Sequence, residues 1–128
     1  MAIGKPTDLT TVRPLEGAVI RRFTVGAAGV AAGDIVTTGA AGVVVCDGDG
    51  STYKKPIGIA IKTAAATATV DVVVLGSITC CTGATVGTPV YPDDTTAGLV
   101  NQTASTNKYS VGTAEAATII FVQPCYIA

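Results

Sequence analysis

The sequence predicts an all-β fold: a small barrel or sandwich of about ten short strands, built from two related β-units and preceded by an extended N-terminal arm. Three observations predict it. Thr, Val and Gly are abundant, while Leu, Glu, Gln and Met, which favour helices, are scarce. Short apolar runs follow one another at close spacing, each bounded by Gly, Pro, Asp or Ser. Two sequence stretches also recur later in the chain at one constant offset.

The predicted strands are the β-branched, apolar runs between these turn signals. They cover residues 18–25, 34–38, 42–46, 57–62, 69–75, 77–81, 88–92, 98–102, 109–113 and 118–123. The intervening stretch TAAATAT (63–69) is short and rich in threonine, so it is predicted to be a loop. Residues 72–75 are apolar on both faces of their strand, which predicts cover on both sides, by the core and by a partner.

The repeat consists of two pairs of matching stretches. GDIV (33–36) recurs as GTPV (87–90), and IGIA (57–60) recurs as VGTA (111–114), both at an offset of 54 residues. Each unit then ends in a Val/Ile-rich strand, VDVVVLG (70–76) or TIIFVQP (118–124), and the second unit is shorter before that strand. We expect two related β-units that close one core together. Gly33 and Gly87 should supply turns, and Gly58 and Gly112 a bulge or tight bend.

The chain is expected to form one domain, residues 18–128, preceded by an arm, residues 1–17. The arm has two prolines, no alternation of apolar and polar residues, and isolated apolar side chains. Such spacing suggests that the arm lies along another protein's surface. The alternative, that residues 1–17 are a first strand or a loose tail of the same domain, stays open.

Composition narrows the function classes. With 48% hydrophobic residues the chain is not expected to be disordered, and its net charge of −1 predicts no nucleic-acid partner. The N-terminus lacks the apolar segment of a secretory signal, and the longest uncharged stretch (72–92) is interrupted by Gly and Pro, so no membrane partner is expected. The chain has no histidine, which removes the commonest general base and metal ligand.

No motif in the sequence predicts a catalytic, metal or cofactor site, and the protein is not expected to be an enzyme. Asp47 with Asp49, and Asp93 with Asp94, are paired carboxylates in Gly-, Thr- and Pro-containing turns. We interpret them as turn residues; a weak cation site is the alternative, but the further acidic ligands of a calcium loop are missing. No phosphate-binding glycine motif is present.

Four cysteines, Cys46, Cys80, Cys81 and Cys125, show no zinc-binding spacing. A strand would point Cys80 and Cys81 to opposite faces, so they are not expected to share one pocket. Buried free thiols, or a disulfide within or between chains, are both open.

The order of several stretches resembles that in the small capsid decoration, or cement, proteins of tailed bacteriophages. The resemblance rests on AAGDIVTTGAAGVVV (31–45), KKPIGIAIKTAAA (54–66), VDVVVLGSI (70–78), VGTPVYPD (86–93) and YSVGTAEAA (109–117), and spans roughly residues 28–124. Two features depart from the family pattern. Gly87-Thr88 stands where the family usually has Gly-Asp, and four cysteines are unusual.

The resemblance implies a structural protein on the outer surface of an icosahedral head, made in the host cytoplasm, that stabilises contacts between major capsid protein subunits. Its expected partners are the major capsid protein and itself, with a trimer favoured over a dimer. Carried onto this chain, the apolar arm residues would anchor in grooves and the basic residues would pair with acidic capsid patches. The expected capsid-binding residues are Ile3, Lys5, Leu9, Val12, Arg13, Leu15, Arg21 and Arg22.

Two alternatives stay open, a carbohydrate-binding β-module and a tail or fibre module of a virion. Sugar sites usually present aromatic platforms, and this chain has no Trp, four Tyr and two Phe. A tail-tube subunit should expose a long hairpin, and none is evident in the sequence.

Overall fold

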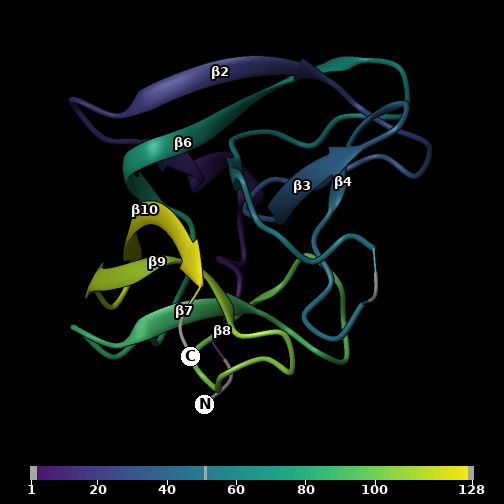
Figure 1. The fold of residues 1–128 in the computed structure, drawn as a ribbon. Helices are drawn as coiled ribbons and strands as arrows, with labels where there is room; N and C mark the ends of the chain where they lie inside the picture. Colours follow the sequence, from purple (N-terminus) through teal and green to yellow (C-terminus); the bar gives the residue numbers. More distant parts are fainter. Residues whose placement is uncertain (1–2, 51, 127–128) are drawn as a thin grey trace.

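The computed structural model describes residues 3–50 and 52–126, and within them the chain is all-β, as predicted (Figure 1). Ten antiparallel strands form one curled, half-barrel sheet, and a single 3-10 turn, η1 (Leu9–Thr11), is the one helical element of these residues. The strands are β1 (Arg13–Pro14), β2 (Val19–Thr24), β3 (Ile35–Gly39), β4 (Gly42–Val45), β5 (Gly58–Ala60), β6 (Thr69–Thr79), β7 (Pro89–Pro92), β8 (Val100–Asn101), β9 (Tyr109–Ala116) and β10 (Ile119–Tyr126).

The long strand β6 connects the two halves of the sheet. The strand order is β4-β3-β5-β6-β10-β9-β7-β8, and β1 and β2 both pair with β6 outside this path. The first part of β6 pairs with β2 and β5, and its last part pairs with β1 and β10. Two predicted strands, 69–75 and 77–81, are therefore one strand, which continues through Gly76. The predicted loop at 63–69 is confirmed up to Ala68, since β6 begins at Thr69.

The two predicted β-units are present, and they share one strand-pairing pattern. In the first unit β3 pairs with β4 and β5, and β5 pairs with β6; in the second, β7 pairs with β8 and β9, and β9 pairs with β10. The registers agree as well, because Val36 lies opposite Gly58 and Val90 lies opposite Gly112. The repeat in the sequence is therefore a repeat in the fold.

The same turn opens both units. The Asp34 N–H donates to the Ala31 carbonyl at 3.1 Å, and the Thr88 N–H donates to the Thr85 carbonyl at 3.3 Å. The third residue of each turn is a glycine with φ +83°, the left-handed region that other residues adopt only with strain. Gly33 and Gly87 thus have the turn role that the sequence predicts.

Gly58 and Gly112 are both required by a close approach of the next strand. Next to Gly112 the register of β9 with β10 also shifts, between Val122 and Cys125, which agrees with the predicted bulge. A Cβ atom on Gly58 would lie 2.2 Å from the carbonyl oxygen of Val73, and one on Gly112 would lie 1.9 Å from that of Phe121. In both units the next strand therefore approaches the glycine backbone too closely for any side chain.

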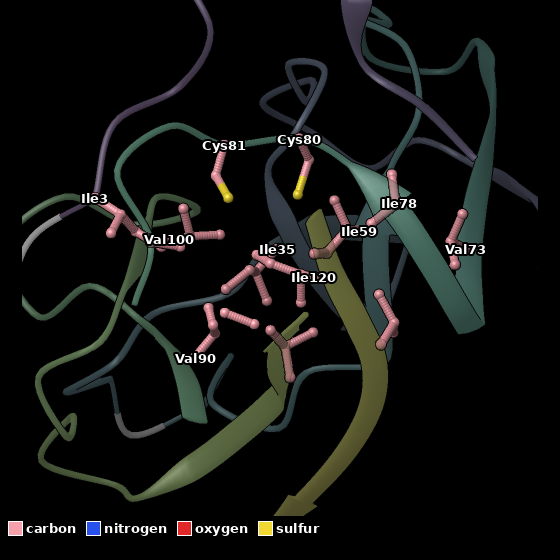
Figure 2. Close-up of a cluster of buried hydrophobic side chains, with 14 of the residues drawn as sticks. Ile3, Ile35, Ile59, Val73, Ile78, Cys80, Cys81, Val90, Val100 and Ile120 are labelled. Atoms are coloured by element: carbon pink, nitrogen blue, oxygen red, sulfur yellow. The ribbon is translucent and has the colours of Figure 1, made fainter. Parts of the chain in front are cut away.

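The main hydrophobic core lies between the units and draws on both of them (Figure 2). Ile35, Ile59 and Val73 come from the first unit, and Val90 and Ile120 from the second; all are fully buried. A second, smaller cluster joins the first unit to the residues that precede it and contains Val25, Val30, Val36, Val43, Ala60, Val70 and Val72. Neighbouring residues of β6, Val72 and Val73, belong to different clusters, so the chain itself covers both faces of the strand at these two residues, whereas Leu75 stays exposed.

Residues 3–15 pack onto the β-domain. Gly4 exchanges two backbone hydrogen bonds with Thr82, and β1, which the sequence did not predict, pairs Arg13 with Thr79. Ile3 and Val12 belong to the main core, with 8% and 5% of their surface exposed. These residues therefore pair with and pack against the strands of their own chain.

Candidate partner-binding surface

The eight residues expected to bind a capsid fall into three environments. Ile3 and Val12 are buried in the core, and Leu9 and Leu15 are partly buried. Arg13 is exposed on β1, and Arg21 and Arg22 are exposed on β2. The remaining residue is part of an ion pair: the Lys5 Nζ lies 2.5 Å from Asp34 Oδ1.

This placement separates the surface residues from the structural ones. Ile3 and Val12 cannot contact another protein unless they leave the core, and the Lys5 charge is already matched by Asp34. Of the eight residues, Arg13, Arg21 and Arg22 are therefore the ones with exposed side chains.

Three large apolar side chains are exposed where β2 pairs with the middle of β6. Val19, Ile20 and Leu75 have 47%, 44% and 44% of their surface exposed, and Val19 lies opposite Leu75 in the ladder. We call these three residues the β2 patch. Val19 and Leu75 are cross-strand neighbours, and Ile20 follows Val19 along the strand. Exposed apolar side chains that gather at one edge of a sheet mark interaction sites more often than scattered ones do.

The strand that carries this patch lies at the edge of the sheet, at the top of Figure 1. Over Val19–Thr24 it pairs with β6 alone among the described residues. Beyond its end, at Val25, the chain forms a parallel bridge with Val43. The outer side of β2 therefore presents unpaired backbone donors and acceptors, which can pair with an added strand.

The two arginines of β2 differ in their surroundings. Arg22 Nε donates to Asp71 Oδ1 at 2.9 Å, and this bond lowers the pKa of Asp71. Both side chains are well exposed, so the pair contributes little to stability. The Arg21 guanidinium lies 5.5 Å from the centre of the Phe23 ring, and no carboxylate among the described residues pairs with it. Arg21 thus remains available to a carboxylate on a partner.

The sequence reasoning missed the patch, although one signal was present. In the run VIRRF (19–23) apolar and basic residues occupy both faces of a predicted strand, so no face is wholly apolar or polar. A strand with a buried face alternates more strictly, because successive side chains point to opposite sides. The broken alternation was the available signal of an edge strand.

The paired carboxylates have the turn role that the sequence predicts. Asp93 accepts hydrogen bonds from the N–H groups of Thr95 and Thr96, and Asp47 accepts one from the N–H of Asp49. Within residues 3–50 and 52–126, no group of three or more His, Cys, Asp or Glu side chains could hold a metal ion. The hydrogen bond and the charge of Asp47 raise the pKa of Asp49, and the charge of Asp94 adds to the effect.

Removing the charge of Asp49 is expected to raise the melting temperature at pH 7. The folded protein holds the Asp49 proton more tightly than the unfolded chain does, so stability falls as the pH rises from the ordinary pKa of 3.8 through the raised one. Asp49→Asn removes this loss. Thermal unfolding should show the gain at low salt and neutral pH, and show none below about pH 3, where Asp49 is protonated in the folded and the unfolded protein. A gain that persists at that pH would contradict this explanation.

All four cysteines are free thiols, and three of them are in the main core. The expectation that Cys80 and Cys81 point to opposite faces is wrong. Strand β6 ends at Thr79, and both sulfur atoms point into the same cluster (Figure 2). Burial, followed by the charge of Asp47, raises the pKa of Cys46 to about 12. The buried thiols are therefore packing residues, while Cys125 is exposed.

We expect one cysteine to react quickly with a thiol reagent in the native protein. At pH 8, Ellman's reagent should modify Cys125 first, since it is the exposed thiol. Cys46, Cys80 and Cys81 should react only when the protein unfolds, and all four should react in denaturant. Mass spectrometry of the partly labelled protein identifies the site. Rapid native labelling of Cys80 or Cys81 would contradict the observed packing.

No helix in the described part of the chain is long and apolar enough to span a membrane. The chain matches no protein-family model and no curated protein.

Proposed function

We propose that this protein is a structural virion protein that binds the outer surface of an icosahedral phage head and stabilises contacts between major capsid protein subunits. The observation that carries the proposal is the exposed apolar edge formed by the β2 patch. The order of the sequence stretches that resemble decoration proteins supports it independently, because those stretches supply β3, β4, β5 and most of β6 in the first unit, and β7 and β9 in the second.

This chain has the physical properties that such a role requires. A protein held in a repeated array needs only a modest interface at each site, because many identical contacts act on one shell. The β2 patch supplies apolar area, and Arg21 beside it supplies charge that fixes orientation. The two-unit core provides a rigid support for this edge.

The expected binding face differs from the one that the sequence suggested. The arm residues Ile3 and Val12 are in the core, so the proposed contact is made by the exposed side chains of β2 and its neighbours. Arg13 on β1 is exposed and extends the basic character of this side, since β1 and β2 both pair with β6.

Binding to purified heads that lack this protein tests the proposal. The wild type should bind saturably and raise the melting temperature of the heads. Ile20→Asp places a charge in the patch and should weaken binding about tenfold or more, since the apolar contact is lost and an unpaired carboxylate would have to give up its water on binding. Val86→Asp is the matched control, because Val86 is 65% exposed but lies before β7 in the other unit.

Each result has a distinct meaning. Failure of the wild type to bind any head would refute the proposed function and favour the carbohydrate-binding or tail alternatives. Binding that is weakened equally by Ile20→Asp and Val86→Asp would retain the function but remove the β2 patch as its site.

A further inference from the structure

The relation between the two units extends to the strand that borders each of them. In the first unit, Val73 of β6 lies between Ile59 of β5 and Ile20 of β2. In the second unit, the equivalent residue of β10 is Phe121, which lies between Thr113 of β9 and Ser77 of β6. Strand β2 therefore borders the first unit in the way that the last part of β6 borders the second.

The two bordering strands differ in what lies on their outer side. The last part of β6 has a further strand paired to it there, whereas β2 has none among the described residues. Strand β1 covers the outer side of the last part of β6, with Arg13 opposite Thr79 and Pro14 opposite Ile78. By the correspondence above, Thr79 and Ile78 are equivalent to Arg22 and Arg21. No strand of the described residues covers the outer side of β2 at these two arginines.

We propose that an extended segment of the partner protein fills this position, adding antiparallel to the outer edge of β2 and placing carboxylates next to Arg21 and Arg22. The inference rests on the proposed function, which makes the partner a major capsid protein subunit. The protein already uses this arrangement within its own chain, where β1 completes the second unit. Main-chain hydrogen bonds supply affinity in such strand addition, and side chains supply specificity.

The positive charge of β2 indicates what kind of partner segment would bind beside it. Arg21 is exposed without a carboxylate partner among the described residues, and Arg22 reaches only the exposed Asp71. A second copy of this protein fits the β2 edge poorly. If two β2 strands paired antiparallel about a twofold axis through their middle, the arginines of the two copies would lie next to one another. Like charges on directly opposed strand residues are destabilising. An acidic segment of a different protein is therefore the better match.

The fold also limits the length of the added strand. The Gly26 N–H donates to the Val43 carbonyl at 2.8 Å, so the chain after β2 is already paired with β4. The free edge covers residues 19–23, which at about 3.3 Å per residue corresponds to about 17 Å. A short extended segment therefore fits this edge, and a long hairpin does not.

Hydrogen exchange with and without heads tests the inference. The wild-type protein is bound to heads that lack it, and amide exchange of residues 19–23 is compared with that of the free protein. Strand addition predicts at least about tenfold slower exchange of the outward-facing amides in the bound state. The amides that face β6 are protected in both states and report that the fold is intact.

Charge variants complete the experiment. Arg21→Glu should weaken head binding about tenfold or more, and Arg21→Lys should retain most of it. Lys108→Glu makes the same change of charge at an exposed position before β9 and should bind as the wild type does. Equal binding by Arg21→Glu and Lys108→Glu would overturn the acidic partner segment.

The outcomes separate this inference from the proposed function. Binding without protection of residues 19–23 would overturn strand addition and leave head binding standing. Protection of these amides in the free protein, rising with its concentration, would show a second copy on the edge and would also overturn the inference. Failure of the wild type to bind heads at all would refute the proposed function and the inference with it.

Discussion

Gly112→Ala is expected to lower the free energy of unfolding by about 3 kcal/mol or more, among the larger effects of a single substitution. The added Cβ would lie 1.9 Å from the carbonyl oxygen of Phe121, so β9 and β10 must separate at the centre of the second unit. Gly58→Ala should have a similar effect in the first unit, because its Cβ would lie 2.2 Å from the Val73 oxygen.

Chemical denaturation of three variants measures this effect. Gly83→Ala is the control, because its φ is +75° but nothing lies within 4 Å of the added Cβ. This control should lower the free energy of unfolding by only about 1 kcal/mol, because alanine adopts the left-handed region with that much strain. If Gly58→Ala or Gly112→Ala were no more destabilising than this control, the strands could not approach as closely as the structure shows.

Asp34→Thr is expected to destabilise the protein by about 2 kcal/mol or more, by releasing the N-terminal segment. The Asp34 carboxylate accepts from Lys5 Nζ at 2.5 Å and from the Ala31 N–H at 2.9 Å, and the side chain is 9% exposed. Threonine stands at the equivalent place of the second unit, Thr88, so the turn itself tolerates it. The substitution therefore removes the charge and leaves the turn residue compatible with the fold.

A double variant shows whether the ion pair causes the loss. Lys5→Met removes the ammonium group that Asp34→Thr would leave without a partner at a site only 19% exposed. The two losses should not add, because removing the second charge relieves the cost of removing the first. Full additivity in denaturation midpoints would show that Lys5 and Asp34 act independently, and that residues 1–17 are not held by this pair.

The strand pattern and the repeat could be predicted from the sequence because both depend on local signals. Turn glycines such as Gly33 and Gly87, and the β-branched runs between them, identify strands without reference to the rest of the chain. The merging of two predicted strands into β6 could not be predicted, because Gly76 looks like a break in the sequence. The strand continues through it since β1, β2, β5 and β10 all pair with β6.

The N-terminal segment shows where local reasoning fails. Its isolated apolar residues have no strand or helix period, so the sequence could not decide between another protein's surface and this protein's own core. Tertiary contacts decide it: Ile3 and Val12 fill the core, and Lys5 meets a carboxylate 29 positions away. Conversely, Ile20 is exposed because β2 lies at the edge of the sheet. That position depends on how distant strands are ordered, which the local sequence around Ile20 does not reveal.

The internal repeat explains why we propose the outer edge of β2 as the binding surface. Two similar units share one core, and the last part of β6 that borders the second unit is covered by β1. The first unit is bordered by β2, whose outer side has no such cover among the described residues. An unpaired edge with exposed apolar side chains favours association, and the arginines of β2 are the reason that we propose an acidic partner segment.

The most direct test of the account is an electron cryo-microscopy map of heads saturated with this protein, into which the structure is fitted. The account predicts that β2 faces the shell and that capsid protein density continues along residues 19–23. Density in which β2 points to solvent, while another face of the sheet contacts the shell, would contradict it.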